Sequence, residues 1–263
     1  MRVVSLHPDV LVATSRIWQT TCTIVRGGDE AFVIDSPVLP DELELLPAVI
    51  EQSRFPQPAG LLATHADWDH LLGRLAFPEA TLGCAASTAE RMRATPGEAQ
   101  RELRAFDDQH YLVRPAPLSL GSVQALDAPG ACEIGPHELA LHPAEGHTSD
   151  GMAIWAPWAG VLVAGDYLSP VEIPVLGDGG SIEAYAATLD RLRPLVAEAQ
   201  FIVPGHGASL GSERALSLLA EDLDYLQALA QHGVQAELPE GRRSKVQRVI
   251  HAENLARTSK SEH

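Results

Sequence analysis

The chain has 263 residues, 45% hydrophobic and 21% charged, which suits one large α/β domain or two small ones and argues against disorder. With 19 Lys and Arg against 35 Asp and Glu, the net charge of −16 disfavours nucleic acid and anionic membranes as partners. The longest uncharged apolar run, residues 151–165, is too short for a membrane helix and contains Pro157. Three cysteines, an odd number, and an N-terminus without a secretory pattern predict a cytoplasmic protein.

Hydrophobic patterning predicts an α/β chain in which short strands alternate with amphipathic helices. In chain order we expect strands 22–26 and 31–35, helix 41–52, strand 60–64, a helix from residue 71, a helical region 87–110, strands 123–126, 138–141, 151–155 and 160–164, helix 182–192, strand 201–203 and helix 213–231. Gly27-Gly28-Asp29 is typical of a hairpin turn, and Asp41 is a candidate cap for its helix.

Residues 87–117 form a more charged stretch, interrupted at Thr95-Pro96-Gly97. Such a stretch is either a plain pair of surface helices or a lid over a substrate entry. Both lysines of the chain lie in its C-terminal tail, so a substrate carboxylate would have to be bound by arginine. The candidates for this role are Arg74, Arg101, Arg104 and Arg114.

Residues 241–263 differ in composition from the remainder of the chain, with six Lys or Arg against two Glu. Val246, Val249, Ile250 and Leu255 fall near helical spacing, which predicts a basic amphipathic helix. We expect this tail to pack back on a domain formed by residues 1–240, or on a second copy of the chain in a homo-oligomer. No other feature supports a nucleic-acid-binding tail.

The strongest chemical signal is the segment Thr64-His65-Ala66-Asp67-Trp68-Asp69-His70, directly after the predicted strand 60–64. Residues at i and i+2 in an extended segment can converge on one ion, and histidine and carboxylate ligands suit zinc, iron and manganese. Ligand-type residues also follow three later strands, each beside a glycine that lets the backbone turn. These segments are Glu145-Gly146-His147-Thr148, Ala164-Gly165-Asp166 and Pro204-Gly205-His206-Gly207.

The motifs HxDxDH, GHT, GD and PGHG, in this order over residues 3–207, resemble those of the metallo-β-lactamase superfamily, whose first motif usually reads HxHxDH. The resemblance implies a four-layer αβ/βα sandwich with the site at one edge of two facing sheets. It also implies two divalent metal ions. The first would be held by His65, Asp67 and His147, and the second by Asp69, His70 and His206, with Asp166 as the bridge.

Asp67 is the one departure from the usual motif, because the superfamily normally has histidine there. A carboxylate favours harder ions, which raises the case for iron or manganese. The other ligands are those of hydrolases in the superfamily, so we expect zinc. Asp67 would bind its ion directly or through water, or would lie outside the coordination shell and leave that ion weakly bound.

We therefore expect a metal-dependent hydrolase that acts on a small-molecule substrate. A hydroxide bridging the two ions would attack an ester, lactone, thioester or related bond, with Asp69 and Asp166 as the catalytic carboxylates. Two alternatives stay open at this point. One is an iron-dependent oxidoreductase on the same fold, and the other is a non-catalytic metal-binding sensor.

Overall fold

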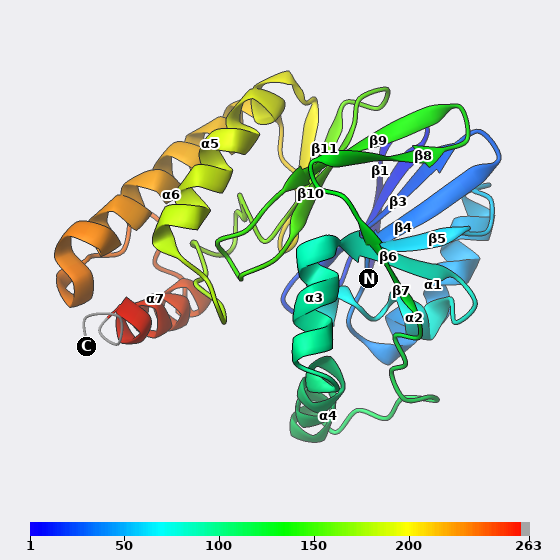
Figure 1. The fold of residues 1–263 in the computed structure, drawn as a ribbon, viewed down its shortest axis with the longest axis horizontal. Helices are drawn as coiled ribbons and strands as arrows, with labels where there is room; N and C mark the ends of the chain where they lie inside the picture. Colours follow the sequence, from blue (N-terminus) through cyan, green and yellow to red (C-terminus); the bar gives the residue numbers. More distant parts are fainter. Residues whose placement is uncertain (259–263) are drawn as a thin grey trace.

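Two β-sheets lie face to face in the computed structural model, which describes residues 1–258, and helices pack on the outer side of each sheet (Figure 1). One sheet has seven strands in the order β1-β2-β3-β4-β5-β6-β7, and the other has five in the order β12-β11-β10-β9-β8. This helix–sheet–sheet–helix arrangement of the described residues confirms the predicted αβ/βα sandwich.

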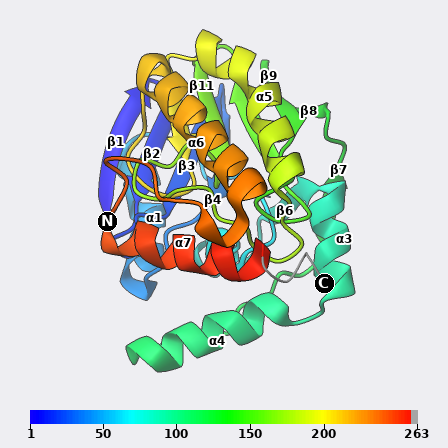
Figure 2. The same ribbon diagram turned by 90° about the vertical axis from the view of Figure 1, so that its left-hand side faces the viewer.

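The first half of the chain forms the seven-stranded sheet. Its strands are β1 (Arg2–His7), β2 (Val10–Thr14), β3 (Thr21–Gly27), β4 (Glu30–Asp35), β5 (Gly60–Ala63), β6 (Thr81–Ala85) and β7 (Val123–Leu126). β1 to β4 pair antiparallel, whereas β4 to β7 pair parallel and so need crossover connections. These connections hold α1 (Pro40–Gln52), α2 (Gly73–Ala76), α3 (Ala86–Ala94) and α4 (Glu98–His110), and α4 extends away from the sheets beyond α3 (Figure 2).

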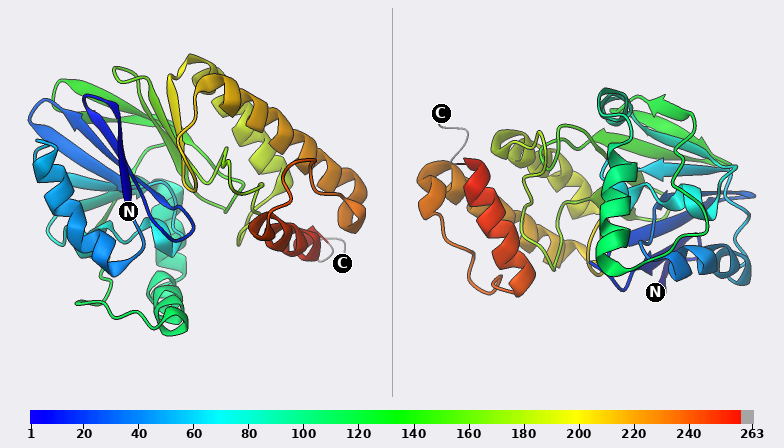
Figure 3. Two further views of the ribbon diagram at one scale, coloured as in Figure 1. Left: turned by 180° about the vertical axis from the view of Figure 1, so that it is seen from behind. Right: turned by 90° about the horizontal axis from the view of Figure 1, so that it is seen from below.

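The second half forms the five-stranded sheet and its helices. The strands are β8 (Gly130–Ile134), β9 (His137–Pro143), β10 (Met152–Ala156), β11 (Val161–Gly165) and β12 (Phe201–Pro204). The helices are α5 (Ile182–Glu198), α6 (Ser212–His232), the short η2 (Gly233–Gln235) and α7 (Lys245–Thr258). α5 and α6 pack side by side over this sheet, and α7 contacts α6 and η2 (Figure 3).

The inner strands of both sheets are buried on both faces, because successive side chains point alternately into two apolar layers, one between the sheets and one beneath the helices. In β10, Met152 and Ile154 belong to the layer between the sheets, whereas Ala153 and Trp155 belong to the layer beneath α5 and α6. A strand of this kind appears in the sequence as a continuous apolar run. That explains why β10 and β11 could be predicted.

Four strands were not predicted: β1, β2, β6 and β8. β1 and β8 are edge strands whose side chains are mostly exposed, so no apolar run marks them. The predicted capping of α1 by Asp41 is wrong. Leu39 is the residue at the cap position, and Asp41 lies in the first turn, where it pairs with Arg16 at 2.7 Å.

The two valines of the C-terminal helix α7 lie on its exposed face, although the sequence predicts them on its packing face. Val246 and Val249 are each 51% exposed, whereas Gln247, Ile250 and Asn254 are buried. The expected apolar face is therefore wrong for the two valines, whereas its other two residues, Ile250 and Leu255, pack against the core. Residues 259–263 of the predicted tail lie outside the described residues, and the division at residue 240 stays a prediction.

No helix within residues 1–258 combines the length and the apolarity that crossing a membrane requires.

Ile154 tests the layer between the sheets, since it is 1% exposed. We expect Ile154→Ala to lower the free energy of unfolding by about 2–5 kcal/mol, because it removes apolar contacts and leaves a cavity. Val246→Ala on the exposed face of α7 is the control, with an expected change within about 0.5 kcal/mol. Chemical denaturation measures both, and equal losses would contradict this description of the core.

Candidate metal centre

Asp35, at the end of β4, fixes the path of the segment that follows β5. Its carboxylate accepts hydrogen bonds from Thr64 N at 2.8 Å and Thr64 Oγ1 at 2.9 Å. Its Oδ2 also lies 3.0 Å from His70 Nδ1. Because β4 and β5 are parallel neighbours, Asp35 reaches these groups from directly beside the strand. The short 3-10 turn η1 (Trp68–His70) then carries Asp69 and His70 towards the other sheet.

Ends of the other sheet's strands supply the remaining predicted ligands. His147 follows β9, Asp166 follows β11 and His206 follows β12. Gly205 is needed beside them, because a Cβ at this position would collide with Asp166 Oδ1. Gly205 N also donates to Gly165 O at 2.6 Å, which joins the ends of β11 and β12.

Each histidine of the cluster has a hydrogen-bond partner at Nδ1. The partners are Thr64 Oγ1 for His65 at 3.0 Å, Asp35 Oδ2 for His70 at 3.0 Å, Val175 O for His147 at 2.8 Å and Trp18 O for His206 at 3.2 Å. A carbonyl or carboxylate partner accepts a hydrogen bond from the protonated Nδ1, so Nε2 keeps the lone pair that a metal ion binds. These contacts orient Nε2 towards the centre of the cluster.

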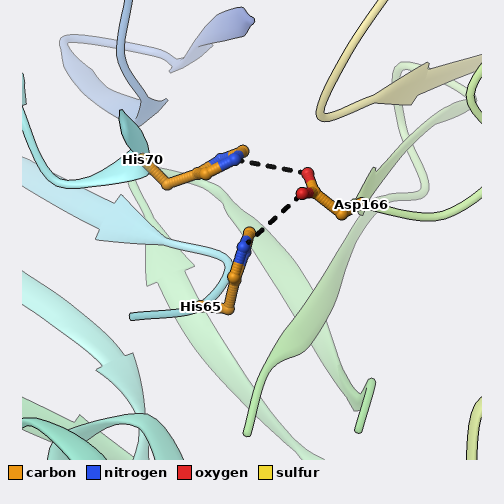
Figure 4. A group of neighbouring side chains, drawn as sticks. All are labelled: His65, His70 and Asp166. Carbon is orange, nitrogen blue, oxygen red and sulfur yellow. Dashed lines mark ion pairs between the residues drawn. The ribbon is translucent and has the colours of Figure 1, made fainter. Parts of the chain in front are cut away.

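Asp166 lies at this centre, facing His65 and His70 from the opposite sheet (Figure 4). Its Oδ1 lies 3.2 Å from His70 Nε2. Its Oδ2 lies 3.3 Å from His147 Nε2 and 3.4 Å from His206 Nε2. One carboxylate therefore contacts histidines on both sides of the cluster, as a bridging ligand must.

Two groups of three side chains flank Asp166, and within each group the ligand atoms lie within 4.8 Å of one another. One group is His65, Asp67 and His147, and the other is Asp69, His70 and His206. The structure thus brings together all seven residues singled out in the sequence, in the two sets that the resemblance implied. That they bind two ions stays a prediction.

Buried polar atoms without partners show that these residues fit a cation. Among the described residues, His65 Nε2, His70 Nε2 and Asp166 Oδ1 are buried without a hydrogen bond. His70 Nε2 and Asp166 Oδ1 are 3.2 Å apart but do not meet with hydrogen-bond geometry. An unpaired buried polar atom costs about 1–3 kcal/mol, and a divalent ion would give each of these atoms a partner.

The histidines and carboxylates shift one another's pKa. Burial alone would lower the pKa of His147, but the hydrogen bond with Asp67 and the charge of Asp166 raise it to about 9. Burial would also lower the pKa of His206, but the charge of Asp166 raises it to about 10. Burial would raise the pKa of Asp166, but the charges of His206 and His70 hold it well below its usual range. Protons on the histidines offset the carboxylates when no metal does, and bound cations would displace them.

The fold and the order of the site residues along the chain match those of one protein family. The family model described as the metallo-beta-lactamase superfamily matches residues 16–206, a range that contains all seven residues of the cluster. This chain belongs to the metallo-beta-lactamase superfamily.

Solved structures share the fold at low sequence identity. A metallo-beta-lactamase from Pontibacter korlensis has a TM-score of 0.64 at 20% identity, covering 86% of this chain and 98% of that one. A metallo-beta-lactamase family protein from Thermus thermophilus has a TM-score of 0.66 at 20% identity, covering 86% of this chain and 83% of that one. The metallo-beta-lactamase type 2 of Bacteroides fragilis is 30% identical over 70 residues, so the match spans 28% of that relative's length.

Arg91 contacts the site, although the sequence did not single it out. It lies on α3, within the segment considered as a lid, and its Nη2 is 2.8 Å from Asp67 Oδ1. Two of the arginines considered for a substrate carboxylate are engaged elsewhere, since Arg74 donates to Ala80 O and Arg114 pairs with Asp107. No local signal marked Arg91, because its contact depends on how α3 packs.

Helix α7 holds the loop that orients His147. Val175 O accepts from His147 Nδ1, and Asn254 of α7 bonds to both neighbours of Val175. Asn254 Nδ2 donates to Pro174 O at 2.7 Å, and its Oδ1 accepts from Leu176 N at 3.0 Å. The C-terminal helix therefore supports a predicted ligand.

Aromatic side chains border the site. The ring centroid of Trp18 lies 5.6 Å from that of Trp68 and 5.1 Å from that of Phe106. Trp68 sits between two predicted ligands in the sequence, and Trp18 supplies the carbonyl that orients His206. Trp18 is 46% exposed, so this cluster presents an apolar surface to solvent beside the site.

We expect the metal-free protein to lose stability as the pH rises from about 7 to about 10. The pKa values of about 9 for His147 and about 10 for His206 exceed the usual value of 6.5. Their contribution to the free energy of unfolding is therefore full below pH 6.5 and is lost as the pH rises through these values, by about 1.4 kcal/mol per unit of pKa difference. Thermal melting with and without EDTA measures this. Metal-loaded protein should respond much less, and identical pH profiles would contradict the exchange of protons for metal.

The contact between α7 and the site predicts that Asn254→Leu weakens the binding of a metal ion. This change keeps the size of the side chain and removes both hydrogen bonds that bracket Val175. We expect one of two bound ions to be held about tenfold more weakly, because partners that orient a ligand contribute at this scale. Gln247→Leu is the matched control, since this buried amide accepts from Ser244 N within the start of the helix. Equal metal affinity in the two variants, measured by chelator competition, would refute the role of Asn254.

Proposed function

We propose that this protein is a hydrolase that binds two divalent ions, with zinc as the best fit, and cleaves an ester, lactone, thioester or related bond in a small molecule. The observation that supports the proposal most directly is the pair of three-residue groups on either side of Asp166. Membership of the metallo-beta-lactamase superfamily supports a metal-dependent hydrolase as the general class.

Two bound ions would lower the pKa of a shared water molecule and polarise the oxygen of the bond to be cleaved. The chain's own residues position the reacting groups. Asp166 lies between the two ligand groups, and the Oδ2 atom of Asp69 faces His206 Nε2 at 3.6 Å and His70 Nε2 at 3.7 Å. We assign Asp69 and Asp166 as the catalytic carboxylates, with Asp69 orienting the attacking water.

The exposure of the site's side chains supports one direction of approach for a substrate. The side chain of Asp67 is 29% exposed, whereas those of the other six predicted ligands are at most 10% exposed. A substrate would therefore approach beside Asp67. The exposed face of Trp18 favours a substrate with an apolar group, because aromatic rings bury large apolar areas.

Asp67 favours a second candidate, an iron-dependent oxidoreductase on the same fold, because a third carboxylate suits harder ions. Elemental analysis and oxygen uptake separate the two candidates. Iron in the purified protein together with substrate-dependent oxygen consumption would favour the oxidoreductase.

We expect the purified protein to hold close to two transition-metal ions per chain and to hydrolyse at least one member of a panel of lactone, ester, thioester and β-lactam substrates. His147→Ala and His206→Ala should each lower kcat by a factor of about 10³ or more, because each removes an ion ligand while leaving the core intact. His232→Ala, an exposed histidine at the end of α6, is the control. Two bound ions without hydrolysis of any substrate would favour a non-catalytic sensor, and no metal uptake at all would refute the site.

A further inference from the structure

Arg91 and Asp67 form an ion pair at the edge of the metal centre. Arg91 Nη2 lies 2.8 Å from Asp67 Oδ1, and the Arg91 side chain is only 15% exposed, so water screens the pair incompletely. The other oxygen, Asp67 Oδ2, faces His147 Nε2 at 3.3 Å and His65 Nε2 at 3.6 Å. The two oxygens of Asp67 thus have separate partners. Oδ1 pairs with the Arg91 cation, and Oδ2 faces the two histidines of its three-residue group.

Asp150 holds Arg91 in this position. Arg91 Nη1 lies 2.8 Å from Asp150 Oδ1, and the Asp150 side chain is fully buried. Asp150 is itself fixed, since it accepts from Ala66 N at 3.0 Å and from Thr148 Oγ1 at 2.9 Å. Because both Nη atoms of Arg91 are engaged by carboxylates, the guanidinium is not free to bind a substrate carboxylate.

A histidine in place of Asp67 would be neutral and would offer one donor atom. An unpaired aspartate differs from such a histidine in two ways: it carries one negative charge, and it has a second oxygen that can bind the metal. Arg91 reduces both differences, because its charge, which it shares with Asp150, partly offsets that of Asp67, and because its Nη2 atom is paired with Asp67 Oδ1. We propose that Asp67 and Arg91 act together as one single-atom metal ligand of reduced charge, with Arg91 as the positioning residue. This inference rests on the proposed metal centre and not on the reaction.

The pairing predicts that a second substitution rescues the first. Asp67→His alone leaves the Arg91 cation, still anchored by Asp150, facing a neutral ligand. We expect zinc affinity at this position to fall about tenfold, or about 1.4 kcal/mol, which is the scale of a unit charge at close range in a partly screened site. Adding Arg91→Gln to Asp67→His should recover most of the loss. The readout is the zinc retained per chain against a competing chelator.

Arg91→Gln in the otherwise unchanged protein gives a second measurement that does not require the histidine variant to fold. It frees Asp67 Oδ1 and restores a full negative charge, so the affinity for manganese relative to zinc should rise about tenfold. Arg91→Gln also leaves Asp150 without its cation, so Arg91→Gln/Asp150→Asn serves if the single variant is unstable. Arg114→Gln is the matched control, because Arg114 is 5% exposed and pairs with Asp107 away from the seven ligands.

The outcomes separate this inference from the proposed function. Wild-type protein that takes up no divalent ion overturns both. A second outcome overturns the pairing alone. In it, the wild-type protein binds two ions, but adding Arg91→Gln to Asp67→His leaves the zinc affinity unchanged or weakens it further. Recovery of zinc affinity in the double variant, with no effect of Arg114→Gln, supports Arg91 as part of the ligand.

Discussion

Three carboxylates, those of Asp67, Asp69 and Asp166, converge on a space a few ångström across, and their mutual repulsion governs how the site is built. Like charges this close destabilise a buried site unless cations lie among them. Neutral imidazoles do not meet that need, so protons or metal ions must do so. Arg91 is the fixed cation that the chain itself contributes, at the most exposed of the three carboxylates. The counter-charge for the other two is left to groups that can exchange.

The residues of the cluster could be singled out in the sequence because each follows a buried apolar run, and because His147, Asp166 and His206 each lie beside a glycine. Their partners could not. Asp35 was visible only as the end of a strand, and its role depends on the parallel pairing of β4 with β5, which periodicity does not specify. Arg91 lies on a charged helix among other arginines, and only the packing of α3 selects it.

Helix α7 shows why hydropathy indicated its packing face only in part. Its valines predicted an apolar contact, yet the surface it covers includes a loop whose backbone groups need hydrogen-bond partners. Buried backbone N–H and C=O groups must be paired, so an amide satisfies them where a valine would not. Asn254 therefore faces inward and Val249 faces outward. A helix that packs against irregular backbone as well as against another helix need not place all its apolar residues on the packing face.

The division of the ligands between the two sheets has a consequence for the nascent chain. His206 follows His70 by 136 residues, and at roughly 5–20 residues per second the ribosome needs on the order of ten seconds to synthesise that interval. Until Asp166 is added, 96 residues after His70, the segment from His65 to His70 has ligand-type side chains but lacks the predicted bridging carboxylate. Any ion captured then is chosen by cellular abundance and by intrinsic ligand affinity, because the rigid geometry that discriminates between metals does not yet exist. If the mature protein holds a metal ion, the competition between metals for its ligands begins before the polypeptide is finished.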